Sequence, residues 1–362
     1  MSATTNFWNG KEKIYNMENN DYSITVIIPT FNKADFIANA IESVLAQTYK
    51  NFEIVIIDDC STDSTSECVK EYLSDTVRYF QHTVNLGPGA TFNDGIEKVR
   101  TPYVSFLASD DMLQPQHLEY AINEFKNDGE IETVFAKLEC IDEKGIKINN
   151  LLEPPFTDKY KLLNDLFYSG NNIPCPGVSF KKTLFQRIPA YNPSFIVCHD
   201  YDLNIRCLMN TKISVIPAPT VLYRRFSDAS NLSGASNWFN LCNSIETKML
   251  LDNYLELNYY DMKNIFPQLH DCSSSEIVFR FLVDTCKNKQ VRLSSWAFEK
   301  LAEYIERHEE IFEKNTFNFQ YKDYIDLYKL NVLNTVAVHT KKCSLLCKMK
   351  NAIKKILKIH AS

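Results

Sequence analysis

Short apolar runs alternate with segments of helical periodicity through the first third of the chain. The runs are rich in Ile, Val and aromatic residues, which is typical of buried strands. They cover residues 23–28, 52–57, 77–80 and 103–107. Between them, apolar residues recur every three or four positions, as on one face of a helix. The predicted helices cover residues 34–47, 63–73 and 89–99. This alternation predicts an α/β fold with a mostly parallel sheet flanked by helices.

Polar residues directly follow three of these predicted strands. The sequence Pro-Thr-Phe-Asn at 29–32 follows the first strand, an acidic and hydroxyl-rich stretch at 58–63 follows the second, and Asp110 with Asp111 follows the fourth. Because βαβ units have one handedness, the carboxyl ends of parallel strands fall on the same edge of the sheet. Ligands of open α/β sheets bind at that edge. We therefore expect one site there.

Asp110 and Asp111 are adjacent carboxylates, which repel each other and are costly to desolvate unless a cation offsets them. Such oxygen ligands suit Mg²⁺ or Mn²⁺ shared with substrate phosphates. The alternative is a solvated turn in which one of them caps a helix that begins near residue 114. Neither a GxGxxG segment after the first strand nor a GxxxxGK[ST] segment occurs, which argues against NAD and P-loop chemistry.

The remainder of the chain changes character beyond residue 232, where helical periodicity dominates. Residues 153–174 show little regularity. The predicted divisions are a flexible lead-in at 1–21, an α/β domain at 22–232, a helical domain at 233–340 and a basic tail at 341–362.

Charge is unevenly distributed along the 362 residues, whose formal net charge is -6. The tail at 341–362 holds seven lysines and no acidic residue, so the body is acidic and does not suit nucleic acid. As a helix, the tail gathers its apolar residues on one face, which is typical of a helix lying in an anionic membrane interface. The alternative is docking on the protein's own acidic body or on a second subunit.

Cysteine usage and hydropathy indicate the compartment. The eleven cysteines form no CxxC pair, which argues against a disulfide framework or a structural zinc site and fits a reducing cytoplasm. The first twenty residues are polar and lack the apolar core of a signal peptide. No stretch approaches the roughly 18 apolar residues of a membrane-spanning helix. We expect a cytoplasmic protein that is either soluble or peripheral to the inner face of the membrane.

Six segments occur in the order of a known family. The segments V-I-I-P-T-F-N, I-I-D-D-C-S-T-D-S-T, N-L-G-P-G and F-L-A-S-D-D resemble the inverting family 2 glycosyltransferases of GT-A fold, of the type that builds bacterial surface polysaccharides. Two later segments, H-D-Y-D-L-N-I-R at 199–206 and Y-R-R at 223–225, are similar to motifs of the same family. The resemblance covers residues 22–230.

This resemblance implies a transferase, of hexosyltransferase type, that uses a nucleotide-diphosphate sugar. The donor is usually a UDP-sugar, and the acceptor a hydroxyl of a glycan or lipid-linked glycan. The implied donor-binding residues are Pro29, Thr30, Phe31, Asn32, Asp58, Asp59, Asn85, Asp110 and Arg224. Either Asp58 or Asp59 would accept a hydrogen bond from the uracil N–H, and helix capping is the alternative for both.

The same resemblance implies the catalytic groups. Asp111, with Asp110 beside it, would hold Mn²⁺ or Mg²⁺ against the two phosphates. Asp200 would be the general base that deprotonates the acceptor hydroxyl, and capping of its own helix is a compatible role. Either Arg224 or Arg225 would contact the diphosphate, with a structural ion pair as the alternative.

Three positions depart from the family pattern. Ala108 stands where a first acidic residue is frequent, Phe92 where an Arg is frequent, and Phe226 where a His is frequent. Two other functions are therefore considered. One is a non-catalytic nucleotide-sugar-binding protein, in which these changes mark lost chemistry. The other is a nucleotidyltransferase, which would need a Gly-rich basic loop after the first strand. Retention of Asp110, Asp111 and Asp200 argues against the non-catalytic protein.

Overall fold

The computed structural model describes residues 22–154, 158–227, 237–308, 310–314 and 316–334. The predicted lead-in at 1–21 and the basic tail at 341–362 lie outside these described residues. Within them, no helix combines the length and the apolar character needed to cross a bilayer.

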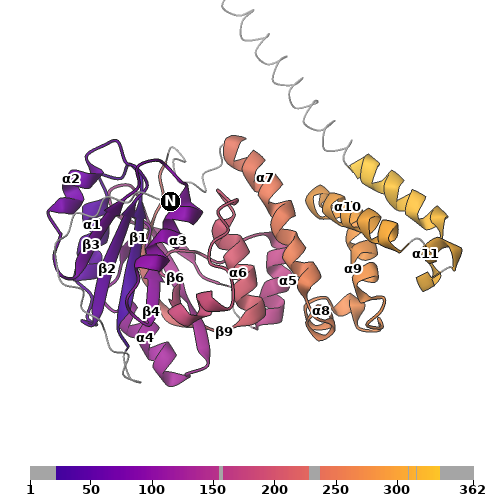
Figure 1. Ribbon diagram of the computed structural model, residues 1–362, viewed down its shortest axis with the longest axis horizontal. Coiled ribbons are helices and arrows are strands. Elements are labelled where there is room, and N and C mark those ends of the chain that lie inside the picture. Colours follow the sequence, from indigo (N-terminus) through magenta and orange to yellow (C-terminus); the bar gives the residue numbers. More distant parts are fainter. Residues whose placement is uncertain (1–21, 155–157, 228–236, 309, 315, 335–362) are drawn as a thin grey trace, which may run out of the picture. The chain divides into compact units, whose positions relative to one another are not determined.

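The strands and helices follow the predicted alternation in the first part of the chain (Figure 1). The strands are β1 (Ile24–Thr30), β2 (Phe52–Asp58), β3 (Val77–Gln81), β4 (Tyr103–Phe106), β5 (Met112–Leu113), β6 (Ile131–Ile141), β7 (Lys147–Leu152), β8 (Ser179–Lys181) and β9 (Lys212–Arg224). The helices are α1 (Ile37–Leu45), α2 (Thr65–Lys70), α3 (Pro88–Lys98), α4 (His117–Asn127), α5 (Lys159–Ser169), α6 (His199–Asn210), α7 (Asn237–Leu251), α8 (Tyr259–Ile265), α9 (Ile277–Cys286), α10 (Val291–Arg307) and α11 (Glu310–Glu313), with a further helix at 321–334.

The strands of the described chain form one sheet in the order β3-β2-β1-β4-β8-β6-β9-β5, with β7 paired to β6. The four strands β3, β2, β1 and β4 are parallel, as the strand-helix alternation predicts. Beyond β4 the sheet is mixed, because β8 is antiparallel to both β4 and β6 while β6 and β9 run parallel. The predicted α/β fold with a mostly parallel sheet is confirmed.

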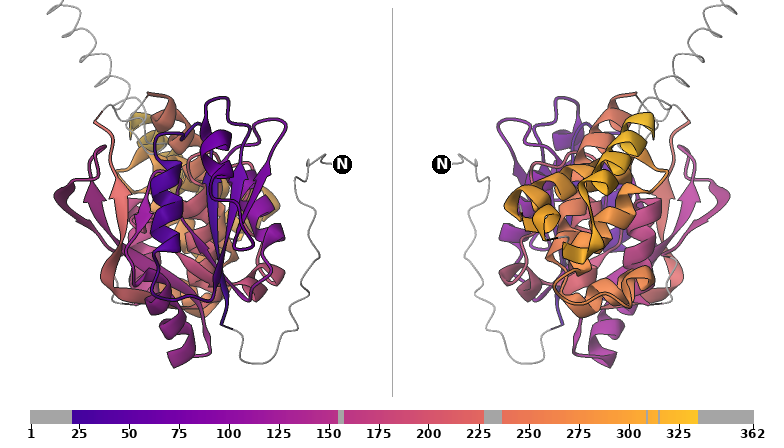
Figure 2. Two further views of the ribbon diagram at one scale, coloured as in Figure 1. Left: turned by 90° about the vertical axis from the view of Figure 1, so that its left-hand side faces the viewer. Right: turned by 90° about the vertical axis from the view of Figure 1, so that its right-hand side faces the viewer.

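Helices cover both faces of the sheet because β1 is apolar on both faces (Figure 2). Ile24, Val26 and Ile28 belong to a buried cluster that also contains apolar residues of α1 and α4. Ile27 points the other way, toward α3, where Gly95 allows a close approach. A Cβ on Gly95 would lie 2.6 Å from a methyl carbon of Ile27, so the packing requires glycine there.

The later part of the chain holds more regular structure than its sequence pattern predicts. The stretch 153–174, expected to be irregular, contains helix α5, whose first turn is capped by the Asp158 carboxylate. Strands β6 to β9 were not predicted from the hydrophobic pattern. The chain divides into two compact units, at 1–246 and 247–362, and the division falls inside α7. The described part of the second unit is helical, as expected for the C-terminal region.

Candidate active site

The loops after β1, β2 and β4 are joined to one another by polar contacts. Asn32 takes a positive φ of 51°, its side-chain oxygen accepts the N–H of Thr62 at 2.8 Å, and its own N–H donates to the Ser61 hydroxyl at 2.9 Å. The Lys33 ammonium lies 2.7 Å from the Asp110 carboxylate. The three strand ends therefore meet at one edge of the sheet, as the handedness of βαβ units predicts.

A cavity of about 460 Å³ opens at this edge. It brings together Asp110, Asp111 and Asp200, which are separated by about 90 residues of sequence. Its lining also includes Pro29, Lys33, Phe92, Phe106, Ala108, Leu138, Asn171, Cys175, His199, Tyr223 and Arg225. Carboxylates concentrated in a partly open, mostly apolar cavity are typical of a ligand site.

Asp111 is 1% exposed and only partly satisfied. Its Oδ1 accepts the N–H of Arg224 at 2.8 Å, whereas its Oδ2 is buried and has no hydrogen-bond partner within the described structure. Burial, and then the charge of Asp110, raise the pKa of Asp111 well above its usual range. An unpaired buried carboxylate oxygen beside a second carboxylate is suited to a bound cation.

The residues around Asp111 fit a divalent ion that shares its ligands with a substrate. No group of three or more His, Cys, Asp or Glu side chains in the described parts of the chain is arranged to hold a metal alone. Mg²⁺ is commonly held by one or two carboxylates together with substrate phosphates, and Asp110 and Asp111 supply that number. The cation predicted from sequence therefore remains compatible with this cavity.

Asp200 lies in the first turn of α6 and lines the cavity. Its carboxylate accepts the N–H of Tyr201 at 2.7 Å and the side-chain amide of Asn171 at 3.2 Å. Burial raises the pKa of Asp200, although the neighbouring His199 and these hydrogen bonds counteract part of that effect. The N-cap residue of α6 is Cys198, and no side chain caps that end, so the predicted capping role of Asp200 is wrong. Its carboxylate instead accepts the N–H of the next residue within the first turn and faces the cavity at the same time.

His199 contacts a backbone carbonyl and two aromatic rings of the protein. Its Nδ1 lies 3.1 Å from the carbonyl oxygen of Ile196, and its ring packs against Phe92 and Tyr191 at centroid distances of 5.9 and 5.6 Å. Phe92, at the position where the family often has Arg, is therefore part of an aromatic wall beneath α6.

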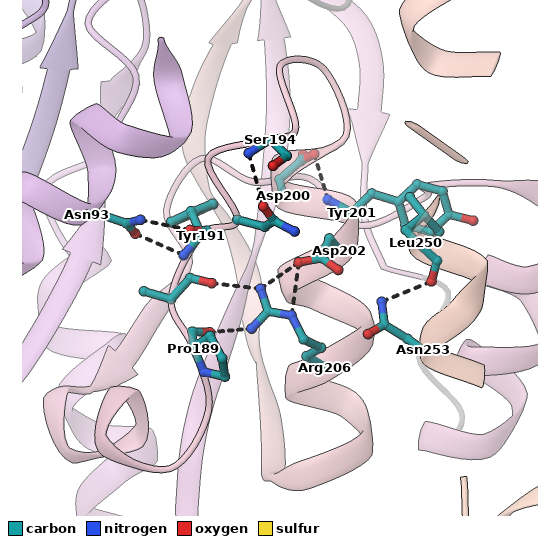
Figure 3. A network of polar contacts seen from close by, with 12 residues as sticks. Asn93, Pro189, Tyr191, Ser194, Asp200, Tyr201, Asp202, Arg206, Leu250 and Asn253 are labelled. Carbon is teal, nitrogen blue, oxygen red and sulfur yellow. Dashed lines mark hydrogen bonds and ion pairs between the residues drawn. The ribbon is translucent and has the colours of Figure 1, made fainter. Parts of the chain in front are cut away.

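A polar network holds the loop before α6 (Figure 3). The Arg206 guanidinium donates to Asp202 at 2.6 and 2.9 Å and also to the carbonyls of residues 189–190. The Asn93 side chain exchanges two hydrogen bonds with the backbone of Tyr191, at 2.7 and 2.9 Å. The ion pair between Arg206 and Asp202 lies within α6, and the bonds of Arg206 to the two carbonyls brace the loop that leads to Asp200.

The two aspartates at the carboxyl end of β2 are buried and hydrogen-bonded within the protein. Asp58 accepts the N–H of Ser61 at 2.7 Å and the Tyr79 hydroxyl at 2.6 Å. Asp59 accepts the backbone N–H groups of residues 86–87, both at 2.8 Å. Neither lines the cavity. The uracil contact that the family resemblance implies for one of them stays a prediction.

Some of the other donor-binding candidates line the cavity and some do not. Pro29 and Asp110 line the cavity, whereas Thr30, Phe31, Asn32 and Asn85 do not. Phe31 is 44% exposed at the surface of the first loop, and Thr30 is buried. The Asn85 side chain donates to the Asp59 carbonyl at 3.3 Å, which connects the loops after β2 and β3.

The two arginines at the end of β9 have different surroundings. Arg224 is 2% exposed, and its guanidinium donates to the carbonyls of Asp110 and Glu143 at 2.9 and 2.8 Å. Arg225 is exposed, lines the cavity and lies over the Tyr223 ring at 5.8 Å. The family resemblance implies a diphosphate contact by either arginine and a donor-binding role for Arg224. Arg224 instead lies within the scaffold, and Arg225 is the arginine at the cavity.

Two further cavity residues were not assigned a role from the sequence. Asn171 hydrogen-bonds Asp200 but belongs to no recognisable motif, so no sequence signal identifies it. Lys33 carries a usable signal, because a basic residue directly after a strand-end loop lies close to whatever anion binds that edge.

The match to known proteins covers the α/β part of the chain. The family model described as "Glycosyl transferase family 2" matches residues 25–188. An uncharacterized glycosyltransferase of Rickettsia typhi is 32% identical over 61% of this chain and 70% of that protein. An uncharacterized glycosyltransferase of Methanocaldococcus jannaschii is 28% identical over 56% of this chain and 70% of that protein.

Two further similarities carry functional names. The chondroitin synthase of Escherichia coli is 28% identical over 51% of this chain, which spans 26% of that longer protein. The fold is similar to that of S. aureus TarS 1–349 in complex with UDP-GlcNAc, with a TM-score of 0.56 at 17% identity. That likeness covers 85% of this chain and 90% of the TarS chain.

Proposed function

Because this chain belongs to glycosyltransferase family 2 and is a transferase enzyme, we propose that it moves a sugar from a UDP-sugar to a glycan hydroxyl with inversion. One observation carries the proposal: Asp110, Asp111 and Asp200 line a single cavity at the carboxyl edge of the sheet. Two of these carboxylates suit the donor's diphosphate and its cation, and the third suits an attacking hydroxyl.

The reaction is a single displacement. The acceptor oxygen attacks the anomeric carbon, its proton passes to the Asp200 carboxylate, and the bond from the anomeric carbon to the diphosphate oxygen breaks. Asn171 and the N–H of Tyr201 keep the Asp200 carboxylate oriented for this transfer. Burial keeps Asp200 basic enough to accept a proton that leaves late in the reaction.

The diphosphate would be bound at the other end of the cavity. Asp111 and Asp110 would hold Mn²⁺ or Mg²⁺, which when bound offsets the negative charge that builds up on the departing nucleotide. Lys33 already offsets the charge of Asp110, and Arg225 offers a planar guanidinium toward the cavity. We assign the diphosphate contact to Arg225, since the guanidinium of Arg224 is bonded to backbone carbonyls.

The comparisons support the substrate class in outline. The TarS chain of similar fold was solved with UDP-GlcNAc, and one relative is named a chondroitin synthase. The first title names a bound nucleotide sugar and the second name indicates synthesis of a glycan, so our proposal includes a glycan or lipid-linked glycan acceptor in the cytoplasm. The basic tail at 341–362 would then contact the anionic inner face of the membrane.

A donor screen tests the proposal. The protein would be incubated with Mn²⁺ or Mg²⁺ and a panel of UDP-, GDP-, CMP- and dTDP-sugars, and nucleotide release would be followed, with Asp200→Asn run alongside. Release from one UDP-sugar that is lost in the variant supports the assignment. If no nucleotide is released, calorimetry with UDP separates an enzyme that lacks its acceptor from a protein without a donor site. Failure to bind UDP, or release from a sugar of another nucleotide, would contradict the proposed donor.

A further inference from the structure

A buried carboxylate outside the family segment holds the backbone directly before the proposed base. Glu246, on α7, is 5% exposed. It accepts the backbone N–H groups of Ile196 at 2.9 Å, Val197 at 2.9 Å and Cys198 at 2.8 Å. Residue 246 lies well beyond the segment 25–188 that matches the family model.

The carboxylate of Glu246 is compensated by backbone N–H groups and not by a cationic side chain. No Lys, Arg or His side chain of the described structure forms an ion pair with it. A buried charge without a counter-ion is costly unless several hydrogen bonds compensate it. Here three backbone N–H groups supply the compensation, and they come from consecutive residues that lead into the N-terminus of α6, where a negative charge is favoured. Each of those N–H groups would otherwise need another acceptor.

A second contact connects the same two segments. The Cys198 thiol lies 3.2 Å from the side-chain oxygen of Asn243, which precedes Glu246 by three positions and so shares its face of α7. Residues 243 and 246 thus bind the loop from one helix face. The loop is short of other regular structure, since no strand or helix covers residues 190–198.

The loop that Glu246 holds borders the cavity. Val197, His199 and Asp200 all contribute to the cavity lining, and Asp200 is two residues beyond the last N–H that Glu246 binds. A displacement of this loop would therefore move the Asp200 carboxylate relative to the cation site, which lies in the loop after β4. Misplacement of a reacting group by about 1 Å is enough to cost about 100-fold in rate.

We infer that Glu246 is a positioning residue, which fixes the loop at 196–198 so that Asp200 meets the acceptor hydroxyl in the orientation needed for proton transfer. Glu246 itself does not touch substrate. The inference rests on the proposed function for the role of Asp200, but the mechanical part, the anchoring of the loop, stands independently of it.

The test compares Glu246→Gln with a matched control on the same helix. Glutamine keeps the size of the side chain but turns an amide nitrogen toward at least one backbone N–H, so the three-bond arrangement cannot persist. Asn240→Ala is the control, since Asn240 is exposed on α7. Three quantities are measured: amide hydrogen exchange of the peptide that spans 196–200, the affinity for UDP, and kcat with the donor found in the screen.

The expected result is selective. In Glu246→Gln the amides at 196–198 exchange faster, kcat falls about 100-fold, and the UDP dissociation constant stays within about twofold of the wild-type value. Asn240→Ala changes none of these. Unchanged amide exchange in Glu246→Gln would overturn the inference. A loss of UDP affinity as large as the loss of kcat, together with lower thermal stability, would also overturn it, because it would indicate a general structural role. If the wild-type protein transfers no sugar, the proposed function fails, while the exchange experiment still decides whether Glu246 anchors the loop.

Discussion

The Lys33 ammonium lies 2.7 Å from the Asp110 carboxylate and 5.1 Å from the centroid of the Phe226 ring. This contact connects the ends of β1 and β4, and it places a positive charge beside the two adjacent carboxylates. Phe226 occupies the position where the family often has a histidine. The positive charge of Lys33 thus lowers the repulsion between Asp110 and Asp111 before any ligand binds.

Removal of this charge is expected to weaken donor binding. In Lys33→Met the two carboxylates lose their nearby counter-charge, and an incoming diphosphate meets a more negative cavity. We expect the UDP dissociation constant to rise about tenfold, a change of about 1.4 kcal/mol in binding free energy. Calorimetry with UDP measures it, and Lys50→Met, at an exposed position, is the control. Equal affinities in the two variants would show that Lys33 is only structural.

Asp111→Asn is expected to separate activity from stability. The asparagine oxygen still accepts the N–H of Arg224, but the group loses the charge that would bind a divalent ion. Sugar transfer should fall at least about 100-fold and should not recover with added Mn²⁺. The melting temperature should be unchanged or higher, because a buried and incompletely bonded charge has been removed. A large drop in melting temperature would instead indicate that the charge stabilises the fold.

The pH dependence of turnover reports on Asp200. A general base must be deprotonated to act, and burial raises the pKa of Asp200 above its ordinary value near 4. The rate should therefore fall as pH decreases through this raised pKa, so the acid limb of kcat lies at higher pH than for an ordinary aspartate. Asp200→Asn should lower kcat by about 1,000-fold while UDP still binds. An acid limb that persists in the residual activity of Asp200→Asn would assign the titration to another group.

The two arginines at the end of β9 give a paired test. Arg225→Gln should weaken UDP binding about tenfold and leave uridine binding and the melting temperature unchanged, because the contact is with phosphate. Arg224→Gln should instead lower the melting temperature, since its guanidinium holds the carbonyls of Asp110 and Glu143. Calorimetry and thermal unfolding on both variants distinguish the roles. The reverse pattern would return the diphosphate contact to Arg224.

Gly177 follows the cavity-lining residue Pro176 in the loop before β8 and cannot accept a side chain. Its φ is +81°, and a Cβ would lie 2.4 Å from a methyl carbon of Val221 and 2.9 Å from the His117 ring. We expect Gly177→Ala to destabilise the protein by about 3 kcal/mol, through overpacking and backbone strain together. Chemical denaturation measures this value. Gly129→Ala is the control, because a Cβ there meets nothing within 4 Å, and a similar loss in both variants would contradict the steric argument.

The first half of the α/β unit could be predicted from the sequence because its signals are local. Strands β1, β2 and β4 are short and largely apolar on both faces, and helices of clear periodicity separate the strands β1 to β4. The fixed handedness of βαβ units then puts their carboxyl ends at one edge, which brought Asp110 and Asp111 to the candidate site without any knowledge of distances. The segments quoted for the family resemblance lie at the same edge or line the same cavity.

The second half depended on contacts between distant segments. Strand β9 pairs with β6 and β5. The hydrophobic pattern of each strand alone does not predict that pairing. Adjacent side chains of a strand point to opposite sides, so the register of β9 decides that Arg225 reaches the cavity and Arg224 does not. No sequence motif distinguishes the two arginines.

The partners of the charged groups were also determined only by the tertiary structure. The sequence by itself determined that a basic residue follows the first strand and that acids follow the second and fourth. Whether Lys33 meets Asp110, and whether Asp59 is free or bonded to the backbone of residues 86–87, depends on how the loops pack. Glu246 is the extreme case, since it binds backbone about 50 residues away. Hydrogen bonds to backbone N–H groups carry no side-chain identity on the partner's side, so no pattern of residue types could reveal them.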